Sequence, residues 1–206
     1  MGELKTVIYR NLWKENPVIG QILGICSSLA VTNLLVNTLV MSIGVTFTLT
    51  LSAFVISLLR NLIPQRIRMM VYTLIIAVFV ILVDIVLRAK FPDISKALGP
   101  YIGLIITNCI LMGRMEAFAQ KNKPSLAMLD GFFSGLGYSI ILMTIAFVRE
   151  FLGFGTIFGI ELGLNFEKWT IMVTPAAAFF LLAILIWIGN NRMAAREIKS
   201  KEEVAK

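Results

Sequence analysis

The amino-acid sequence predicts an all-α integral membrane protein with six transmembrane helices. Of its 206 residues, 58% are hydrophobic and 15% are charged, whereas soluble domains are typically about 45–50% apolar and about 25% charged. No charged residue occurs between Asn16 and Leu59. That length allows two crossings, because one helical crossing of a bilayer takes ~20 residues. Long apolar runs separated by short polar stretches indicate a membrane protein with several spans.

The apolar runs define the expected helices and a single membrane domain over residues 1–206. The first two runs follow each other with no room for a proper loop, short charged stretches separate the second to the fifth, and a longer polar stretch (149–169) leads to the sixth. The expected spans are about Ile19–Val36, Thr38–Leu59, Met69–Leu87, Ala97–Gly113, Leu126–Val148 and Thr170–Ile188. The opening residues mix both signs of charge and lack a small-residue cleavage site, which argues against a removable signal peptide.

The distribution of lysine and arginine predicts the orientation of the helices. The N-terminal segment, the loops after the second and fourth spans, and the C-terminal segment hold 14 of the 19 basic residues. Short loops rich in lysine and arginine stay in the cytoplasm, so both termini are expected as short cytoplasmic tails. The 14 residues are Lys5, Arg10, Lys14, Arg60, Arg66, Arg68, Arg114, Lys121, Lys123, Arg192, Arg196, Lys199, Lys201 and Lys206. The remaining five are Arg88, Lys90, Lys96, Arg149 and Lys168.

Six spans divide into two halves of three, about 18–88 and about 97–190. Because each half has an odd number of spans, the halves run in opposite directions through the membrane, which is the arrangement of an inverted repeat. The pentapeptides LAVTN (29–33) and LIITN (104–108) share three identities and fall in the opening span of each half. The sequence therefore predicts a 3+3 inverted repeat.

The two cysteines of the chain, Cys26 and Cys109, lie in those same opening spans. At 1.5 Å per helical residue, both thiols are expected near the bilayer midplane or somewhat toward the cytoplasm. Small and polar residues surround each cysteine, which favours close helix approach or an interrupted helix. They are Gly24, Ser27, Ser28, Thr32 and Asn33 around the first, and Gly103, Thr107, Asn108 and Gly113 around the second. Interruption of the first and fourth helices indicates a site at the midplane.

Three interpretations of the cysteine pair remain open from these residues alone. A lone cysteine in a membrane helix usually acts as a small apolar side chain, and a Cys26–Cys109 disulfide is the second interpretation. The C-x-x-C pair typical of thiol oxidoreductases is absent. The third is cluster ligation, because two thiolates are half of the four-cysteine ligand set of an iron–sulfur cluster. With no histidine and two cysteines, the chain cannot complete such a site without a second subunit.

Charged residues at the ends of the expected spans are first of all structural candidates. Asp84 lies near the end of the third span, and Arg88 follows at i,i+4, so an ion pair is expected rather than a role in an ion pathway. Arg114 and Glu116 follow the fourth span, where they can brace the half-helix of Cys109 or contact a neighbouring subunit. Structural anchoring is also expected of Asp130, Arg149 and Glu150. No phosphate-binding loop, nucleophile elbow or metalloprotease motif occurs.

Five segments resemble a known family of membrane subunits. They are GICSSLAVTN (24–33), SLLRNLIPQRIR (57–68), GLIITNCILMGRMEAFA (103–119), LDGFFSGLGY (129–138) and REFLGFGTIFG (149–159). From about Trp13 to Trp187 the chain is similar to the D-type subunits of sodium-translocating NADH:quinone oxidoreductases (NQR). It is also similar to the E-type subunits of the related Rnf complexes, which are ferredoxin:NAD oxidoreductases.

The resemblance implies a six-helix inverted-repeat subunit that pairs with a homologous subunit of opposite orientation, of the NQR E type or the Rnf A type. It also implies a [2Fe–2S] cluster shared between the two subunits, with Cys26 and Cys109 as the iron ligands from this chain. The cluster would relay single electrons between flavin or iron–sulfur carriers of other subunits, coupled to transport of Na⁺ or H⁺ across a bacterial or archaeal cell membrane. The chain would then be a subunit of an ion-translocating oxidoreductase, with no complete active site of its own. Two alternatives are a redox-free secondary transporter subunit and a purely structural anchor subunit.

Overall fold

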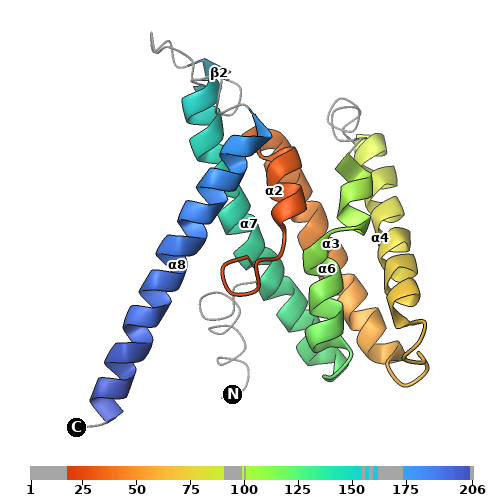
Figure 1. Cartoon of the computed structure of the whole chain (residues 1–206). Helices are drawn as coiled ribbons and strands as arrows, with labels where there is room; N and C mark the ends of the chain where they lie inside the picture. Colours follow the sequence, from red (N-terminus) through yellow and green to blue (C-terminus); the bar gives the residue numbers. More distant parts are fainter. Residues whose placement is uncertain are drawn as a thin grey trace.

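The computed structural model describes residues 18–90, 99, 101–154, 156–157, 160–161 and 174–204. These residues are helical apart from an antiparallel hairpin of two short strands, β1 (Thr156–Ile157) and β2 (Ile160–Glu161), and the connecting turns. In chain order, the helices are α2 (Ile25–Val31), α3 (Leu35–Leu59), α4 (Arg68–Lys90), a helix at 101–106, α6 (Cys109–Arg114), the π-helix η2 (Met115–Ala119), α7 (Pro124–Phe154) and α8 (Pro175–Val204). The long helices lie side by side as a bundle (Figure 1).

Several helical segments have the length and composition of membrane spans. Leu35–Leu59, Arg68–Lys90, Tyr101–Ala119 and Pro124–Gly153 are long and apolar enough to cross a bilayer, and the apolar part of α8 is shorter. The expected second, third and fifth spans therefore each correspond to one helix, α3, α4 and α7. The sixth was expected to start at Thr170, which lies outside the described residues, and α8 begins at Pro175.

The first expected span, Ile19–Val36, is not a continuous helix. Residues 18–21 form a turn, and α2 comprises seven residues before its C-cap at Thr32. Seven helical residues rise ~10 Å, which is a fraction of a bilayer core of about 30 Å. The fourth expected span is also divided, because the helix at 101–106 ends before Asn108 and α6 begins at Cys109. Both segments are thus interrupted next to a cysteine.

The two pentapeptides that suggested a repeat do not occupy equivalent positions. LAVTN contains the end of α2, with Thr32 as the C-cap, whereas LIITN contains the break before α6, with Asn108 as the N-cap. The cysteines hold the equivalent positions, since each lies within the first two residues of its short helix. Cys26 and Cys109, rather than the two pentapeptides, thus share a position at the start of a short helix.

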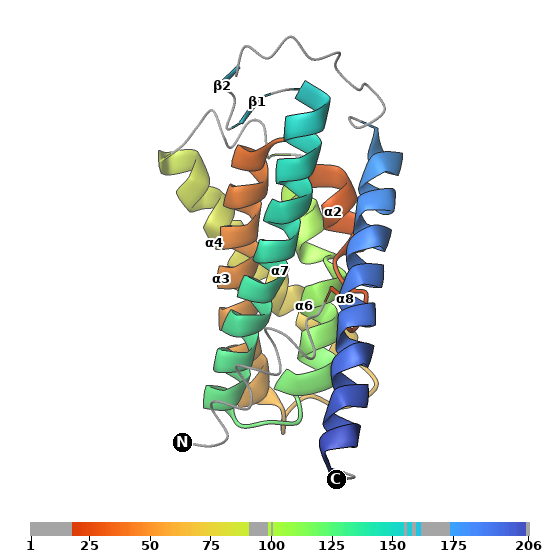
Figure 2. The same ribbon diagram turned by 90° about the vertical axis from the view of Figure 1, so that its left-hand side faces the viewer.

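The most extensive helix contact among the described residues is between α3 and α7. Glycines allow it: a Cβ on Gly135 would lie 2.8 Å from Thr46 Cγ2, and a Cβ on Gly131 would lie 3.1 Å from the carbonyl oxygen of Leu49. Close approach suits a membrane protein, because van der Waals packing rather than loss of water contact drives helix association in lipid. Figure 2 shows the two helices side by side through the middle of the bundle.

Basic residues concentrate at one end of the described bundle. The connection after α3, the turn before α7 and the last turns of α8 lie at the same end (Figures 1 and 2). They carry Arg60, Arg66, Lys121, Lys123, Arg196, Lys199 and Lys201, while Arg88, Lys90 and Arg149 lie toward the opposite end. Lys5, Arg10, Lys14, Lys96, Lys168 and Lys206 lie outside the described residues. The excess of lysine and arginine from which the orientation was predicted therefore lies at one end of the described bundle.

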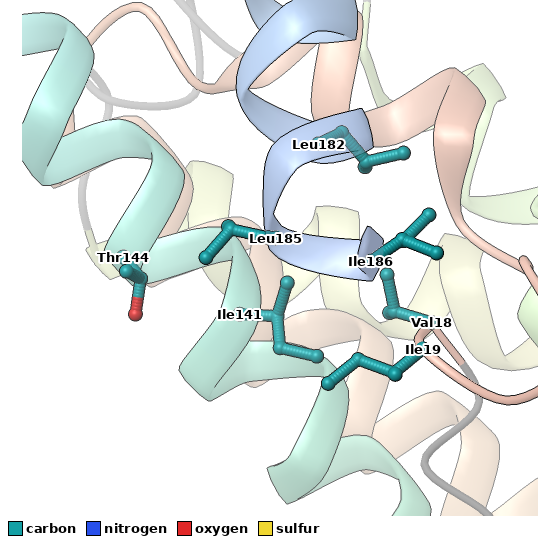
Figure 3. Close-up of a pocket in the computed structure, with 7 residues that line it drawn as sticks. All are labelled: Val18, Ile19, Ile141, Thr144, Leu182, Leu185 and Ile186. Carbon is teal, nitrogen blue, oxygen red and sulfur yellow. The ribbon is translucent and has the colours of Figure 1, made fainter. Parts of the chain in front are cut away.

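A small apolar cavity lies between α7, α8 and the turn at 18–21. It has a volume of about 60 Å³ and is lined by residues that include Val18, Ile141 and Leu182 (Figure 3). Its single polar side chain is Thr144, whose hydroxyl donates to the carbonyl oxygen of Ile140 on the same helix. The cavity thus presents no charged or metal-binding group, and the candidate site lies elsewhere.

Candidate metal centre

The fold brings Cys26 and Cys109 together, although 83 positions separate them in the chain. Their Sγ atoms lie 3.8 Å apart. Both are free thiols; Cys26 is exposed on the surface of the chain and Cys109 is partly buried. The two candidate ligands therefore form one site, with one edge open to a neighbouring molecule.

Each cysteine lies in the first turn of a short helix. Helices α2 and α6 begin near the middle of the bundle and run toward opposite ends (Figure 1). The N–H groups in the first turn of a helix have no partner within that helix, so both helices direct backbone donors and the positive ends of their dipoles toward the sulfur pair. The donor that reaches a sulfur atom directly is the N–H of Gly24, which donates to Cys109 Sγ.

Gly24 determines how α2 begins. Its φ of +90° lies in the left-handed region, which glycine adopts without strain. Its N–H donates to Cys109 Sγ, with a nitrogen–sulfur distance of 2.7 Å. A Cβ at this position would lie 2.7 Å from Cε2 of Tyr138. Backbone conformation and packing both require glycine here, and the start of one half-helix is bonded to the sulfur of the other.

Asn108 separates the helix at 101–106 from α6. Its backbone is extended, and its side-chain oxygen accepts a hydrogen bond from the N–H of Ile110 at 3.3 Å. Asparagine is a preferred N-cap because its side chain satisfies such an N–H. A polar residue next to Cys109 thus interrupts the helix, as the small and polar residues around this cysteine predicted.

Tyr138 of α7 lies behind the cysteine pair and is fully buried. Its hydroxyl donates to Ser27 Oγ and accepts from Asn108 Nδ2 at 3.4 Å. Ser27 in turn donates to the carbonyl oxygen of Gly24 at 2.9 Å. No sequence pattern assigned a role to Tyr138. The available signal was a tyrosine inside an apolar span, since a buried tyrosine hydroxyl usually has a hydrogen-bond partner.

The thiol pair fits a tetrahedral metal centre. Two thiolates bound at ~2.3 Å to one tetrahedral metal ion lie roughly 3.8 Å apart, and the observed separation is 3.8 Å. Within the described part of the chain, no three histidine, cysteine, aspartate or glutamate side chains gather as a metal site. The exposed Cys26 leaves one side of the pair accessible to a neighbouring molecule.

Arg114 braces the half-helix of Cys109, which is one of the two roles expected for it. Its guanidinium pairs with Asp130 on α7, with a distance of 3.1 Å from Nε to Oδ2. The two side chains are 3% and 2% exposed. Arg114 also lies over the ring of Phe118, 5.6 Å from the ring centre. The structural roles expected for Arg114 and Asp130 are therefore two halves of one contact between α6 and α7.

Glu116 fastens η2 to α4. Its Oε1 pairs with Arg68 at 2.5 Å. Next to this pair, the side-chain oxygen of Gln120 accepts hydrogen bonds from the hydroxyl of Tyr72 at 2.8 Å and from Arg68 at 3.2 Å. Glu116 therefore supports the segment that follows Cys109 through α4, whereas Asp130 supports it through α7.

Arg149 and Glu150, both buried, anchor the opposite end of α7. Arg149 donates to Thr32 Oγ1 at 2.6 Å and to the carbonyl oxygen of Thr174 at 3.2 Å. Glu150 accepts a hydrogen bond from the N–H of Leu35 at 2.6 Å. These contacts hold the turn between α2 and α3, so they support the half-helix of Cys26 as Arg114 supports that of Cys109.

Asp84 and Arg88 form the ion pair expected from their spacing. The distance from Arg88 Nε to Asp84 Oδ1 is 3.1 Å, and a second contact measures 2.8 Å. The Arg88 side chain is 69% exposed, so this pair lies at the surface near the end of α4. It is separate from the cysteine site.

Comparison with known proteins identifies the family. Residues 4–186 match the family described as "Rnf-Nqr subunit, membrane protein". The D-type subunit of the Na(+)-translocating NADH-quinone reductase of Pseudoalteromonas translucida is 44% identical over 192 residues, which cover 90% of this chain and 91% of the relative. The proteins of the same name from Shewanella loihica and Chlamydia abortus are 44% identical over 210 residues and 46% identical over 197 residues, covering 99% and 90% of this chain and 97% and 92% of the relatives. The family match and the relatives both span nearly the whole sequence, so the chain belongs to the Rnf-Nqr family of membrane subunits.

Proposed function

We propose that this chain is an electron-transferring membrane subunit of a Na⁺-translocating NADH:quinone reductase in a bacterial cell membrane. The relatives support this assignment, because proteins similar over nearly the whole chain are named as the D-type subunit of such a reductase. The Rnf complex is the related assembly within the same family. In either complex the chain acts with other subunits, which carry the flavin and the remaining iron–sulfur centres.

The separation of 3.8 Å between the two sulfur atoms carries the proposal. In the proposed role, Cys26 and Cys109 bind a [2Fe–2S] cluster, which supplies one-electron redox chemistry. The other two cysteine ligands come from a homologous subunit that packs in opposite orientation against the exposed edge of Cys26. This arrangement needs a thiol pair that reaches the surface of each subunit, and in this chain Cys26 is exposed and Cys109 is partly buried beside it.

The surrounding residues orient the two thiolates and stabilise them. The N–H of Gly24 donates to Cys109 Sγ, and hydrogen bonds to ligating sulfur atoms raise the potential of a cluster by stabilising its reduced state. Arg114, through Asp130, holds the half-helix of Cys109 against α7. The proposed role of the chain is therefore to bind the cluster and to set its reduction potential, and no substrate bond is made or broken on it.

The proposal includes a 3+3 inverted repeat within one membrane domain, with halves at about 18–88 and 97–190 and both termini in the cytoplasm. Two half-helices that begin together and run toward opposite ends support the repeat. The basic residues at one end of the bundle support the orientation. Antiparallel subunits that meet at a redox site can rock against each other when the charge of that site changes, and we propose that this motion couples electron transfer to transport of Na⁺ or H⁺.

Iron analysis and EPR spectroscopy of the anaerobically reduced complex test the proposal. Relative to the wild-type complex, Cys109→Ala should lose the iron, the acid-labile sulfide and the EPR signal of one cluster while the complex stays assembled. Thr73→Ala is the control, because this exposed hydroxyl donates to Met70 within its own helix, and it should leave the signal unchanged. An assembled Cys109→Ala complex with the same iron content and the same EPR signals as the wild type would contradict the proposal and favour a redox-free transporter. Undiminished electron transfer in Cys26→Ala would favour an anchor subunit.

A further inference from the structure

A directed chain of hydrogen bonds runs behind the cysteine pair. Asn108 Nδ2 donates to the hydroxyl of Tyr138, that hydroxyl donates to Ser27 Oγ, and Ser27 donates to the carbonyl oxygen of Gly24. The hydroxyls of Tyr138 and Ser27 each accept one hydrogen bond and donate the next. Hydrogen bonds in such a series polarise and strengthen one another in a low-dielectric interior.

The residues in this chain are the immediate neighbours of the two cysteines. Ser27 follows Cys26, and Asn108 precedes Cys109. Tyr138 is the one member that comes from a different helix, the long α7, which also packs closely against α3. Its hydroxyl is therefore the point at which the two cysteine-bearing segments, far apart in sequence, are joined through a third element.

The ring of Tyr138 adds a second contact at the same place. It packs so closely on Gly24 that a Cβ there would lie 2.7 Å from Cε2 and 3.1 Å from Cδ2. The N–H of Gly24 donates to Cys109 Sγ. The tyrosine ring thus supports the residue that bonds the sulfur, while the hydroxyl supports the residues beside both sulfur atoms.

We propose that Tyr138 is a positioning residue that holds Cys26 and Cys109 at the separation required to bind one metal centre. Its hydroxyl bonds to two residues that each adjoin a cysteine, and hydrogen bonds in the shell around metal ligands fix the orientation of those ligands. The inference rests on the proposed function only for the identity of the metal group. The distance of 3.8 Å between the two sulfur atoms does not depend on that identity. Loss of the hydroxyl should weaken metal binding, because substitution of residues that orient ligands typically costs about 10–100-fold in metal affinity.

Zn²⁺ affinity of the full chain tests this proposal without the cluster. Zn²⁺ accepts thiolate ligands in tetrahedral geometry, and its binding to the reduced chain in detergent micelles can be measured by competition with a chromogenic chelator. Tyr138→Phe should weaken Zn²⁺ binding by about tenfold. Cys109→Ala defines the binding that does not depend on the thiol pair. Tyr72→Phe is the matched control, because Tyr72 is equally buried and its hydroxyl donates to Gln120, away from the cysteines; it should bind Zn²⁺ like the wild type.

A second measurement uses the assembled complex. If Tyr138 positions the ligands, Tyr138→Phe should change the EPR line shape or the midpoint potential of the cluster signal, and Tyr72→Phe should change neither. Wild-type Zn²⁺ affinity in Tyr138→Phe, with loss of affinity in Cys109→Ala, would overturn the inference and leave the cluster proposal standing. Weakened Zn²⁺ binding in Tyr138→Phe, together with a Cys109→Ala complex whose iron content and EPR signals match the wild type, would support the positioning role and overturn the proposed function.

Ser27→Ala keeps the test decisive if Tyr138→Phe fails to fold. It removes the acceptor of the Tyr138 hydroxyl and leaves the tyrosine ring packed on Gly24. The variant should weaken Zn²⁺ binding in the same direction, because the half-helix of Cys26 loses its bond to α7. A Ser27→Ala chain that is monodisperse in detergent and binds Zn²⁺ like the wild type would overturn the inference.

Discussion

Arg114 and Asp130 form an ion pair inside the helix bundle, with 3% and 2% of their side chains exposed. The pair joins the half-helix of Cys109 to α7, the same helix that contacts both cysteine-bearing segments through Tyr138. Each charge is tolerated away from water because the other compensates it. Helix α7 therefore supports the cysteine site through two separate contacts, the Arg114–Asp130 ion pair and the hydrogen bonds of Tyr138.

Breaking this pair should strongly destabilise the chain. Asp130→Asn leaves the Arg114 charge buried without its compensating carboxylate, and we expect the free energy of unfolding to fall by ~3–5 kcal/mol. Denaturant titration of the chain in detergent micelles, followed by circular dichroism, measures the loss. The control is Asp84→Asn, which breaks the surface pair with Arg88 and should cost about 0.5 kcal/mol or less.

The double substitution Arg114→Met with Asp130→Leu shows how much of the stability loss comes from the uncompensated charge and how much from altered packing. It removes both charges, so it should recover much of the stability that Asp130→Asn loses. Equal stability of Asp130→Asn and Asp84→Asn would contradict the burial of the Arg114–Asp130 pair.

Gly24→Ala should disrupt the start of α2. Alanine is strained in the left-handed backbone conformation of this position, and its Cβ would lie 2.7 Å from the Tyr138 ring. Residue 24 must therefore move, and its N–H can no longer donate to Cys109 Sγ. We expect a lower melting temperature and weaker Zn²⁺ binding. The control is Gly103→Ala, since nothing lies within 4 Å of its Cβ position; in a helix this change should be neutral or stabilising by up to about 1 kcal/mol. The same melting temperature in both variants would contradict the contact.

Gly135→Ala should separate α3 from α7. A Cβ there would lie 2.8 Å from Thr46 Cγ2 and 3.0 Å from its Cα, and overpacking of this kind costs ~1–3 kcal/mol. Adding Thr46→Ala removes the closest atoms and should recover part of the loss, measured as the free energy of unfolding in a double-mutant cycle. Additive effects of the two substitutions would show that the two positions do not contact each other.

Glu150→Ala should loosen the start of α3. The carboxylate accepts a hydrogen bond from the N–H of Leu35, and a hydrogen bond to a charged group is worth ~1.5–3 kcal/mol. Hydrogen exchange at the Leu35 amide should become faster, and Glu150→Gln, which keeps an oxygen acceptor, should have a smaller effect. Thr144→Ala serves as the control on the same helix, because its hydroxyl bonds within α7. Unchanged protection of Leu35 in Glu150→Ala would exclude this contact.

The sequence predicted the long helices well, because hydropathy acts locally. The spans expected at Thr38–Leu59, Met69–Leu87 and Leu126–Val148 correspond to α3, α4 and α7, which extend them by a few residues at one or both ends. Hydropathy failed for Ile19–Val36, where α2 occupies seven residues. An apolar run shows that a segment can enter lipid, but not that its backbone stays helical. Gly24 has a non-helical backbone, in which its N–H donates to Cys109 Sγ and its Cα packs against the ring of Tyr138.

The sequence by itself determined that the chain is a membrane protein, that its basic residues are asymmetric, and that Cys26 and Cys109 are the candidate ligands. These conclusions depend on composition and on order along the chain. The tertiary structure decided that the two sulfur atoms lie 3.8 Å apart, that Tyr138 joins the segments that carry them, and that Asp130 is the partner of Arg114. Such contacts depend on how helices distant in sequence pack in three dimensions, and neither periodicity nor hydropathy contains that information.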